Sequence, residues 1–343
     1  MVVPFVLCFV VSLAAGRRKG SLGGMNPYLG IDGGGTHTRA VLVTGDGRVV
    51  GAGEAGPCNY HNVGLETAGA NLRAAAEAAW AAAGLRFQAA PAAFIGSAGM
   101  KAAVDLARLT SAAENAGLAP AGEITVANDL HNALAGGLAG RAGVALIAGT
   151  GSNCLGRDAS GATFMCGGWG WLIDDDGSGT GLALAAMRAV VRAVDGRAPA
   201  TRLTQALLAF WGLSEPDELS ERLYVRPWTP DQLAGFTPVV CRLAEEGDSV
   251  AREVLLSGAK ALAQLVKGAT AALDFPKGPE VVVLGGCARS GAPYQPLVEA
   301  AIRAAVHDVR LVEPVYSPLH GAALNVLRVA GQPTPKTLRF TKP

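Results

Sequence analysis

Two glycine-rich segments carry the backbone groups best suited to binding a phosphorylated ligand. They are Asp32-Gly33-Gly34-Gly35-Thr36 and Gly149-Thr150-Gly151-Ser152, and each stands between two apolar runs predicted to be strands. The first lacks the lysine of a Walker loop and leads into a strand, which also excludes the dinucleotide-binding fingerprint. A glycine turn leaves N–H groups unpaired with no Cβ atom in the way, and such amides bind phosphate oxygens. Either segment alone could be a simple hairpin turn, but two of them favour a phosphate site.

A carboxylate stands where a predicted strand gives way to a helix. Asp129, in Ala127-Asn128-Asp129, follows the apolar run at 123–127 and precedes a helix predicted near 131–139. A carboxylate at the carboxyl end of a strand could face a cleft and accept the proton of a hydroxyl that attacks a γ-phosphate. Aspartate is also a common N-cap that only completes a helix end, so both roles stay open.

Tryptophan and acidic residues follow the second glycine turn. In Gly167-Gly168-Trp169-Gly170-Trp171 the glycines would leave an indole face open for stacking on a sugar ring, and a core tryptophan beside a glycine turn is the alternative. Asp174-Asp175-Asp176 precedes a predicted helix. Acids at a helix start commonly interact only with its dipole, and the alternating spacing of a calcium loop is absent.

A third glycine pair lies near the carboxyl end of the chain. Gly285-Gly286-Cys287-Ala288-Arg289-Ser290 follows an apolar strand predicted at 280–284. The pair would let a flat adenine ring approach the backbone, or it would form an ordinary strand-to-helix turn.

The elements predicted around these motifs form the same unit twice. Strands at 28–31, 38–43 and 48–53 form an antiparallel meander, and strands at 143–148, 153–156 and 162–166 repeat it. Helices at 65–83, 101–117 and 131–139 and strands at 92–96 and 123–127 lie between the meanders. After the second come helices at 180–194, 201–212, 231–246, 248–273, 295–306 and 318–330, with strands at 280–284 and 309–313. The duplication predicts an α/β fold whose two lobes enclose a cleft suited to nucleotide phosphates.

We expect an amino-terminal lobe over 25–140, a carboxyl-terminal lobe over 141–330 whose last helix could return to the first lobe, and a loose tail over 331–343. Residues 2–15 are an apolar run followed by Arg17-Arg18-Lys19. This run is shorter than the roughly 20 residues that span a bilayer, and a secretory signal would carry its charge before the apolar part. We expect residues 1–24 to lie outside the fold, which would begin after Met25. The alternative is that the apolar run is a membrane anchor of reversed orientation.

Composition limits the possible partners. The chain has 343 residues, enough for about two domains, and its 29 basic and 28 acidic side chains give a net charge of +1. This balance argues against nucleic-acid coating and against an acidic disordered chain, and we expect no stable membrane association. The six cysteines lack metal-binding spacing and indicate reduced thiols and a cytoplasmic location, although Cys154 and Cys166 could pair by chance on neighbouring strands.

Taken together, the motifs resemble the N-acetylglucosamine kinases of the BadF/BadG/BcrA/BcrD group, in the actin/hexokinase/Hsp70-like ATPase superfamily. The resemblance covers about residues 27–330. Its most specific part is GTGSNC at 149–154 with CGGWG at 166–170, and DGGGT at 32–36 is moderately specific. It implies a two-lobed actin-like ATPase fold of ribonuclease H-like type, use of ATP and Mg²⁺, a small sugar substrate and a homodimer.

The resemblance also implies a role for individual residues. The ATP phosphates would meet Gly33, Gly34, Gly35, Thr36, Thr150 and Gly151. Asp32 would contact Mg²⁺ through water, and the positions near adenosine would be Gly235, Gly286 and Ser290. The sugar would be held by Asn59, Ser152, Asn153, Gly168, Trp169, Gly170 and Asp175, with Asp129 contacting it as the catalytic base. One departure concerns the family's Gly-Asp-Glu, which reads Asp174-Asp175-Asp176 here and puts the identity of the sugar in question.

The expected function is ATP-dependent phosphorylation of N-acetylglucosamine at its 6-hydroxyl. A glucosamine kinase of the same group is an alternative, because the acidic run 174–176 could suit a protonated amine. A dehydratase-activating ATPase is another, but it needs a cluster-binding cysteine in a dimer, and no cysteine stands in a recognisable cluster motif. A sugar-sensing regulator usually adds a helix-turn-helix, which residues 1–24 cannot form.

Overall fold

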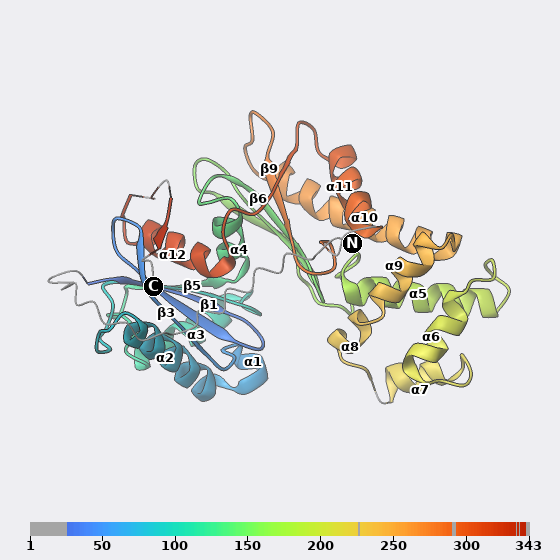
Figure 1. The fold of residues 1–343 in the computed structure, drawn as a ribbon, viewed down its shortest axis with the longest axis horizontal. Helices are drawn as coiled ribbons and strands as arrows, with labels where there is room; N and C mark the ends of the chain where they lie inside the picture. The colour runs from blue at the N-terminus through green and yellow to red at the C-terminus, as the bar shows by residue number, and fades with distance from the viewer. Residues whose placement is uncertain (1–25, 226, 290–292, 334, 336, 341–343) are drawn as a thin grey trace.

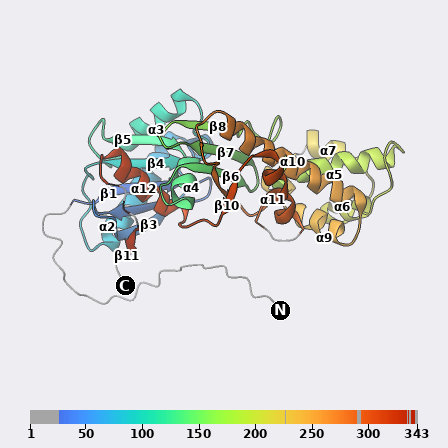
Figure 2. The ribbon, with the colours of Figure 1, turned by 90° about the horizontal axis from the view of Figure 1, so that it is seen from above.

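The computed structural model describes residues 26–340 apart from 226, 290–292, 334 and 336. The expectations for residues 1–24 and for Ser290 therefore concern residues outside those described. Two mixed sheets form the centre of the molecule, and Figures 1 and 2 show them side by side with most of the later helices gathered at one end.

The first sheet has the strand order β11-β3-β2-β1-β4-β5. The meander is β1 (Tyr28–Gly33), β2 (Thr38–Val43) and β3 (Arg48–Ala55), and β4 (Ala93–Ser97) and β5 (Ile124–Asn128) continue the sheet parallel to β1. In this register Gly33 lies beside Ser97, and Ser97 lies beside Asn128. The ends of three strands thus bring the first glycine turn, the loop after β4 and Asp129 to one edge of the sheet.

Side-chain alternation along these strands divides the first lobe into two cores. Leu29, Ile31 and Leu42 pack toward α2 (Leu65–Ala82) and α3 (Ala103–Asn115), which follow the short α1 (Tyr60–Val63). Val41 and Phe94 pack on the opposite face, against α12 (Pro318–Val329). The last long helix therefore lies on the sheet of the first lobe.

The second sheet repeats the meander and has the order β10-β9-β6-β7-β8. Its strands are β6 (Gly143–Ala148), β7 (Ser152–Arg157), β8 (Thr163–Gly167), β9 (Glu280–Leu284) and β10 (Arg310–Val312). The helices of this lobe are α5 (Gly179–Val194), α6 (Leu203–Trp211), α7 (Glu218–Tyr224), α8 (Pro230–Ala234), α9 (Thr237–Glu245), α10 (Ser249–Ala271) and α11 (Tyr294–Ala305). Cys154 faces Cys166 across β7 and β8, and neither forms a disulfide.

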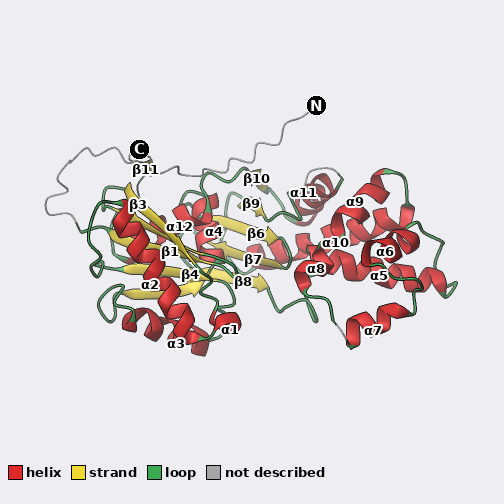
Figure 3. Cartoon of the chain, turned by 60° about the horizontal axis from the view of Figure 1, so that its bottom comes forward, coloured by secondary structure: helices red, strands yellow, loops and turns green. Residues whose placement is uncertain are grey.

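One helix joins the two sheets. In α4 (Leu130–Gly137), Leu130 and Leu134 pack on Leu155 and Val282 of the second sheet. On its other side α4 lies against α12, and Figure 3 shows both helices among the strands of the two sheets. A Cβ added at Gly321 of α12 would lie 1.9 Å from the carbonyl oxygen of Asn132, so only glycine allows this approach. The start of α4 is thereby fixed relative to both lobes.

Three predictions about secondary structure are wrong. The single helix expected over 231–246 is two helices, because the chain turns at Gly235 and Phe236 and Pro238 starts α9 afresh. The short helices α1 and α7 were not expected. The tail over 331–343 is not loose throughout, since Arg339–Phe340 forms β11, which pairs with β3 and donates the Arg339 N–H to the Gly47 oxygen at 2.8 Å.

Across the described residues, each helix is either too short or too polar to cross a bilayer.

Candidate active site

Asp129 stands at the first residue before α4, but its carboxylate does not cap the helix. The side chain makes no capping hydrogen bond, while its backbone N–H donates to the Ser97 oxygen at 3.2 Å. Asp129 is half-buried. Burial and the nearby charge of Asp32 together raise the pKa of its carboxyl group to about 6, against a smaller lowering by the backbone N–H groups of Leu130 and Asp129. A carboxylate with this pKa is ionised at neutral pH and basic enough to accept a proton. The N-cap alternative is therefore not supported.

Asp32 ends the strand that leads into the first glycine turn. Burial raises the pKa of its carboxyl group, and a hydrogen bond from Asn132, at 3.1 Å, opposes this rise. Gly34 donates its N–H to the His37 oxygen at 2.8 Å, which closes the turn. Gly35 and Thr36 are exposed, and a Cβ at Gly35 would have only the Asn62 amide within 4 Å. This turn therefore presents open backbone beside Asp32, as a phosphate-binding turn requires.

The second glycine turn is fastened to the start of α5. Gly179 donates to the Gly149 oxygen at 2.8 Å, and Thr180 donates to the Thr150 oxygen at 3.1 Å. A Cβ added at Gly149 would meet no heavy atom within 4 Å. The Thr150 hydroxyl donates to Asp231 of α8 at 2.7 Å, a contact that sequence analysis missed because 81 residues separate the partners. The turn is thus rigidly placed and open on one side.

The third glycine pair lies next to the second turn. A Cβ at Gly285 would be 2.4 Å from the Ala148 oxygen, whereas one at Gly286 would meet nothing within 4 Å. Gly235 ends α8, one turn after Asp231, and Phe210 lies 3.6 Å from where its Cβ would be. The predicted nucleotide positions of the second lobe therefore fall in two places, each connected to the Thr150 turn.

Asp175 adopts a backbone conformation that a side chain rarely takes. Its φ is 65°, in the left-handed region, and it is buried. Its Oδ1 accepts the Ser152 N–H at 2.9 Å, and a Cβ at Gly151 would lie 3.0 Å from its other oxygen. A non-glycine residue in this region costs on the order of 1–3 kcal/mol, and such strain clusters at functional sites. Asp175 is thereby held against the second glycine turn.

The loop after β8 presents Trp169, but one of its faces is not open as the flanking glycines suggested. The indole is 66% exposed, and the ammonium of Lys101 lies 3.3 Å from its ring centroid. Lys101 also donates to the carbonyl oxygens of Gly167 and Gly168, both at 3.2 Å. Asp174, the residue expected to replace a glycine of the family, accepts a hydrogen bond from the backbone N–H of Trp169 at 3.3 Å. Sequence analysis missed Lys101 because nothing in its local pattern marks a contact between lobes.

Asn153 lies close against Gly168, another of the positions expected to bind the sugar. Gly168 has a φ of 71°, and a Cβ there would lie 2.3 Å from the Asn153 side-chain nitrogen. Gly170 is also left-handed, and a Cβ there would have no neighbour within 4 Å. These glycines let the backbone of the loop lie against Asn153 and leave space beside Trp169.

The first lobe brings Asn59 to the same region. Its oxygen accepts the His61 N–H at 3.2 Å, and its amide would lie 3.1 Å from a Cβ at Gly99. Asn128 donates to the Met100 oxygen at 3.1 Å. The segment 99–101 therefore runs from Asn59, past the residue before Asp129, to the loop of Trp169. It connects Asn59, the strand that precedes Asp129 and the loop after β8.

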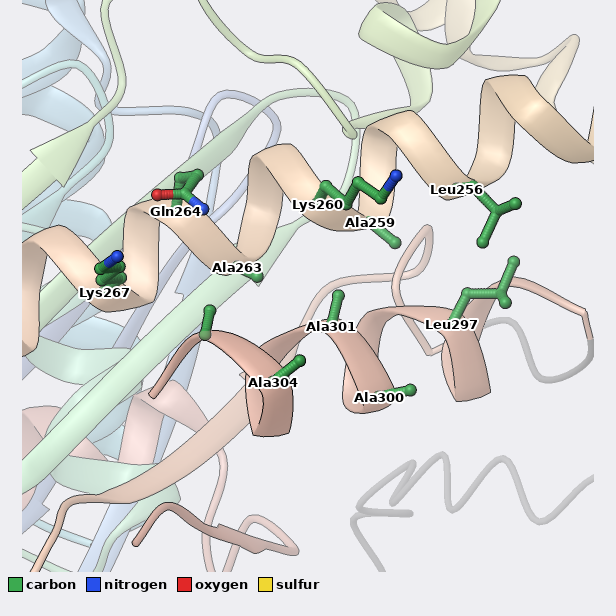
Figure 4. A pocket seen from close by; sticks show the side chains of 11 residues that line it. Leu256, Ala259, Lys260, Ala263, Gln264, Lys267, Leu297, Ala300, Ala301 and Ala304 are labelled. Atoms are coloured by element: carbon green, nitrogen blue, oxygen red, sulfur yellow. The ribbon is translucent and has the colours of Figure 1, made fainter. Parts of the chain in front are cut away.

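A separate groove of about 440 Å³ lies between α10 and α11 (Figure 4). Its walls are mainly alanine and leucine, with the polar side chains of Lys260, Gln264 and Lys267. No carboxylate lines it, and none of the predicted site residues does. We therefore take the residues around Asp129, at the carboxyl end of β5, as the candidate active site.

Within the described part of the chain, no group of three or more histidine, cysteine or acidic side chains could hold a metal ion by itself. Mg²⁺ commonly takes only one or two carboxylates and completes its coordination with water and substrate phosphates. The charge of Asp32 contributes to the raised pKa of Asp129, and a divalent cation would relieve this repulsion. The donors present therefore fit a metal that arrives with a nucleotide.

Comparison with known proteins decides between the families that this geometry allows. A sequence profile of the BadF/BadG/BcrA/BcrD ATPase family matches residues 29–326. The chain belongs to this family.

Named relatives narrow the activity. An N-acetylmuramic acid/N-acetylglucosamine kinase of Clostridium acetobutylicum is 31% identical over 262 residues, which are 76% of this chain and 85% of the relative. A glucosamine kinase of Vibrio cholerae is 32% identical over 234 residues, 67% of this chain and 76% of the relative. A crystal structure from Chromobacterium violaceum, provisionally assigned as an N-acetylglucosamine kinase, has a TM-score of 0.68 at 27% identity and covers 88% of this chain and 99% of that one.

The BadF-family chain therefore has the two-lobed actin-like ATPase fold that its motifs predicted. It is a sugar kinase that uses ATP to phosphorylate a small sugar.

Proposed function

We propose that this sugar kinase phosphorylates N-acetylglucosamine at the 6-hydroxyl, with Asp129 as the general base. The observation that carries the proposal is the state of Asp129: its carboxylate caps no helix, its pKa is raised to about 6, and it lies beside Asp32. An aspartate that only caps a helix is expected to have a lowered pKa, whereas here burial and Asp32 outweigh the lowering by the backbone N–H groups of Leu130 and Asp129.

On the nucleotide side, the open glycines of the two turns bind the ATP phosphates through their N–H groups. Thr36 and Thr150 add hydroxyls, and Gly235 and Gly286 lie toward the adenosine. Ser290, the third position expected near the adenosine, is outside the described residues. Asp32 would hold the Mg²⁺ through water, and the metal would neutralise charge on the phosphates when bound. The support is that, among the described residues, no heavy atom lies within 4 Å of where a Cβ at Gly149 or Gly286 would stand.

On the sugar side, the two lobes contribute different groups. Asp129 accepts the hydroxyl proton as the oxygen attacks the γ-phosphate, and the closed cleft excludes water from that position. Asp175, strained and buried, is preorganised to accept hydrogen bonds from sugar hydroxyls. The remaining sugar contacts are Asn59, Ser152, Asn153, Gly168, Trp169 and Gly170. We place the two lobes at 25–140 and 141–330, with α12 packed on the first.

A coupled ADP-release assay tests the proposal across N-acetylglucosamine, glucosamine, N-acetylmannosamine, N-acetylmuramic acid, glucose and no sugar. The highest kcat/KM is expected for N-acetylglucosamine, and phosphorus NMR of the product should show the phosphate on the 6-oxygen. A higher kcat/KM for another sugar, or phosphate at the anomeric oxygen, would contradict the assignment.

Glucosamine is the second candidate acceptor. It is favoured by the acidic run 174–176 and by the likeness to the glucosamine kinase of Vibrio cholerae. The Lys101 ammonium argues against it. Burial raises the pKa of Asp175 and the charge of Lys101 opposes this rise, so the ammonium is near Asp175 and would repel a protonated amine in the same region. N-acetylglucosamine has no such charge.

A further inference from the structure

A buried amide on α4 contacts the carboxylate at the end of β1. Asn132 is fully buried, and its Nδ2 donates to the Ile31 oxygen at 3.0 Å and to Asp32 Oδ1 at 3.1 Å. It lies close under the strand, since a Cβ at Gly96 would be only 2.3 Å from this nitrogen. Asn132 therefore has no room to turn away from Asp32.

A second buried amide fixes which way the first one points. Asn325 of α12 donates its Nδ2 to Asn132 Oδ1 at 3.3 Å and to the His131 oxygen at 2.9 Å. Because the oxygen of Asn132 faces this donor, its nitrogen must face Ile31 and Asp32. The Oδ1 of Asn325 is itself buried with no hydrogen-bond partner, which is a stability cost.

We propose that Asn132 is a positioning residue for phosphoryl transfer, which holds the Asp32 carboxylate toward the first phosphate turn, and that Asn325 sets the orientation of Asn132. The proposal rests on the proposed role of Asp32 on the nucleotide side. Neither asparagine touches substrate; both act through Asp32. The hydrogen bonds from Asn325 to Asn132 and from Asn132 to Asp32 also connect α12 and α4 to the first glycine turn.

A purely structural role is the competing explanation, because Asn132 also bonds to the backbone of β1. Asn132→Leu separates the two, since leucine has a similar volume and cannot donate. In the full chain, calorimetry should show the Kd for Mg²⁺ with the nonhydrolysable analogue AMPPNP rising about tenfold, as for loss of a hydrogen bond to a charged group. The Kd for N-acetylglucosamine alone should stay within about twofold, because Asp32 lies on the nucleotide side.

Two further variants keep the proposal testable. Asn325→Ala leaves the bond to Asp32 in place but removes the donor that orients Asn132, and the nucleotide Kd should rise about threefold. If Asn132→Leu does not fold, Asn325→Ala carries the test. Thr201→Val is the matched control, because it removes a half-buried hydroxyl that donates to Asp248, far along the chain in the second lobe, and should leave both Kd values unchanged.

The positioning role would be overturned if folded Asn132→Leu had a nucleotide Kd within twofold of wild type and only a lowered melting temperature. If Asn132→Leu does not fold, the same result in folded Asn325→Ala would overturn it. An equal rise in the sugar Kd would also overturn it. Failure of the proposed sugar specificity would be visible separately, as a different preferred sugar in the wild-type assay, and would not alter these binding constants.

Discussion

The ammonium of Lys101 lies 3.3 Å from the ring centroid of Trp169, although the two residues belong to different lobes. A cation at this distance over an indole is attracted by the ring quadrupole, by about 0.5–1 kcal/mol where solvent is near. The same ammonium binds the two carbonyl oxygens that precede the tryptophan. Lys101 therefore connects the loop that carries Trp169 to the lobe that carries Asp129.

Removal of the Lys101 charge should alter selectivity between amino sugars. In Lys101→Met the ratio of kcat/KM for glucosamine to that for N-acetylglucosamine is expected to rise about threefold, since repulsion between exposed like charges is worth under about 1 kcal/mol. Kinetics at low and high salt measure it, and the rise should shrink at high salt. Lys260→Met, in the groove between α10 and α11, is the control. An unchanged ratio in Lys101→Met would place the ammonium away from the sugar amine.

Trp169→Ala should weaken the sugar more than the nucleotide. The exposed indole loses its contact with the sugar ring, and a stacking contact is worth about 1 kcal/mol or somewhat more, so the sugar KM should rise several-fold. The ATP KM should change little. Trp169→Phe keeps an aromatic face and should show a smaller rise. If all three proteins have the same sugar KM, the indole does not contact the sugar.

The raised pKa of Asp129 predicts the acid limb of the pH profile. The base works only when ionised, so kcat should be flat above about pH 7 and fall as pH drops through about 6. The measurement is kcat from pH 5 to 8 at saturating Mg²⁺, ATP and sugar. The residual rate of Asp129→Asn should lack this limb, which separates the enzyme carboxylate from the titration of ATP itself. A limb that persists in the variant would assign it to another group.

Much of the fold was predictable because its patterns are local. The strands at Thr38–Val43, Gly143–Ala148 and Glu280–Leu284 were predicted with their observed ends, since they are apolar runs close to glycine-containing turns. The split of α8 from α9 was missed because their shared apolar periodicity continues through Gly235. The strand β11, at the carboxyl end of the chain, pairs with β3 near its amino end. No local sequence pattern indicates a pairing between such distant segments.

The candidate site was predictable where backbone chemistry defines it and not where side chains meet across the fold. Glycine turns and the aspartate after a strand are local features. Lys101 and Asn132 act through partners that are 68 and 100 residues away, or on the other lobe. The left-handed φ of Asp175 was also hidden, because aspartate gives no sign of it in sequence.

The most direct test of the account is kcat of Asp129→Asn with N-acetylglucosamine, measured beside the sugar KM and the melting temperature. Asparagine is nearly isosteric but cannot accept the hydroxyl proton, so kcat should fall on the order of 10²–10⁴. The melting temperature near pH 8 should be equal or higher, because the variant removes a carboxylate whose charged form is disfavoured in the folded protein. A folded variant with kcat within about threefold of wild type, under 1 kcal/mol of barrier, would contradict the base role of Asp129.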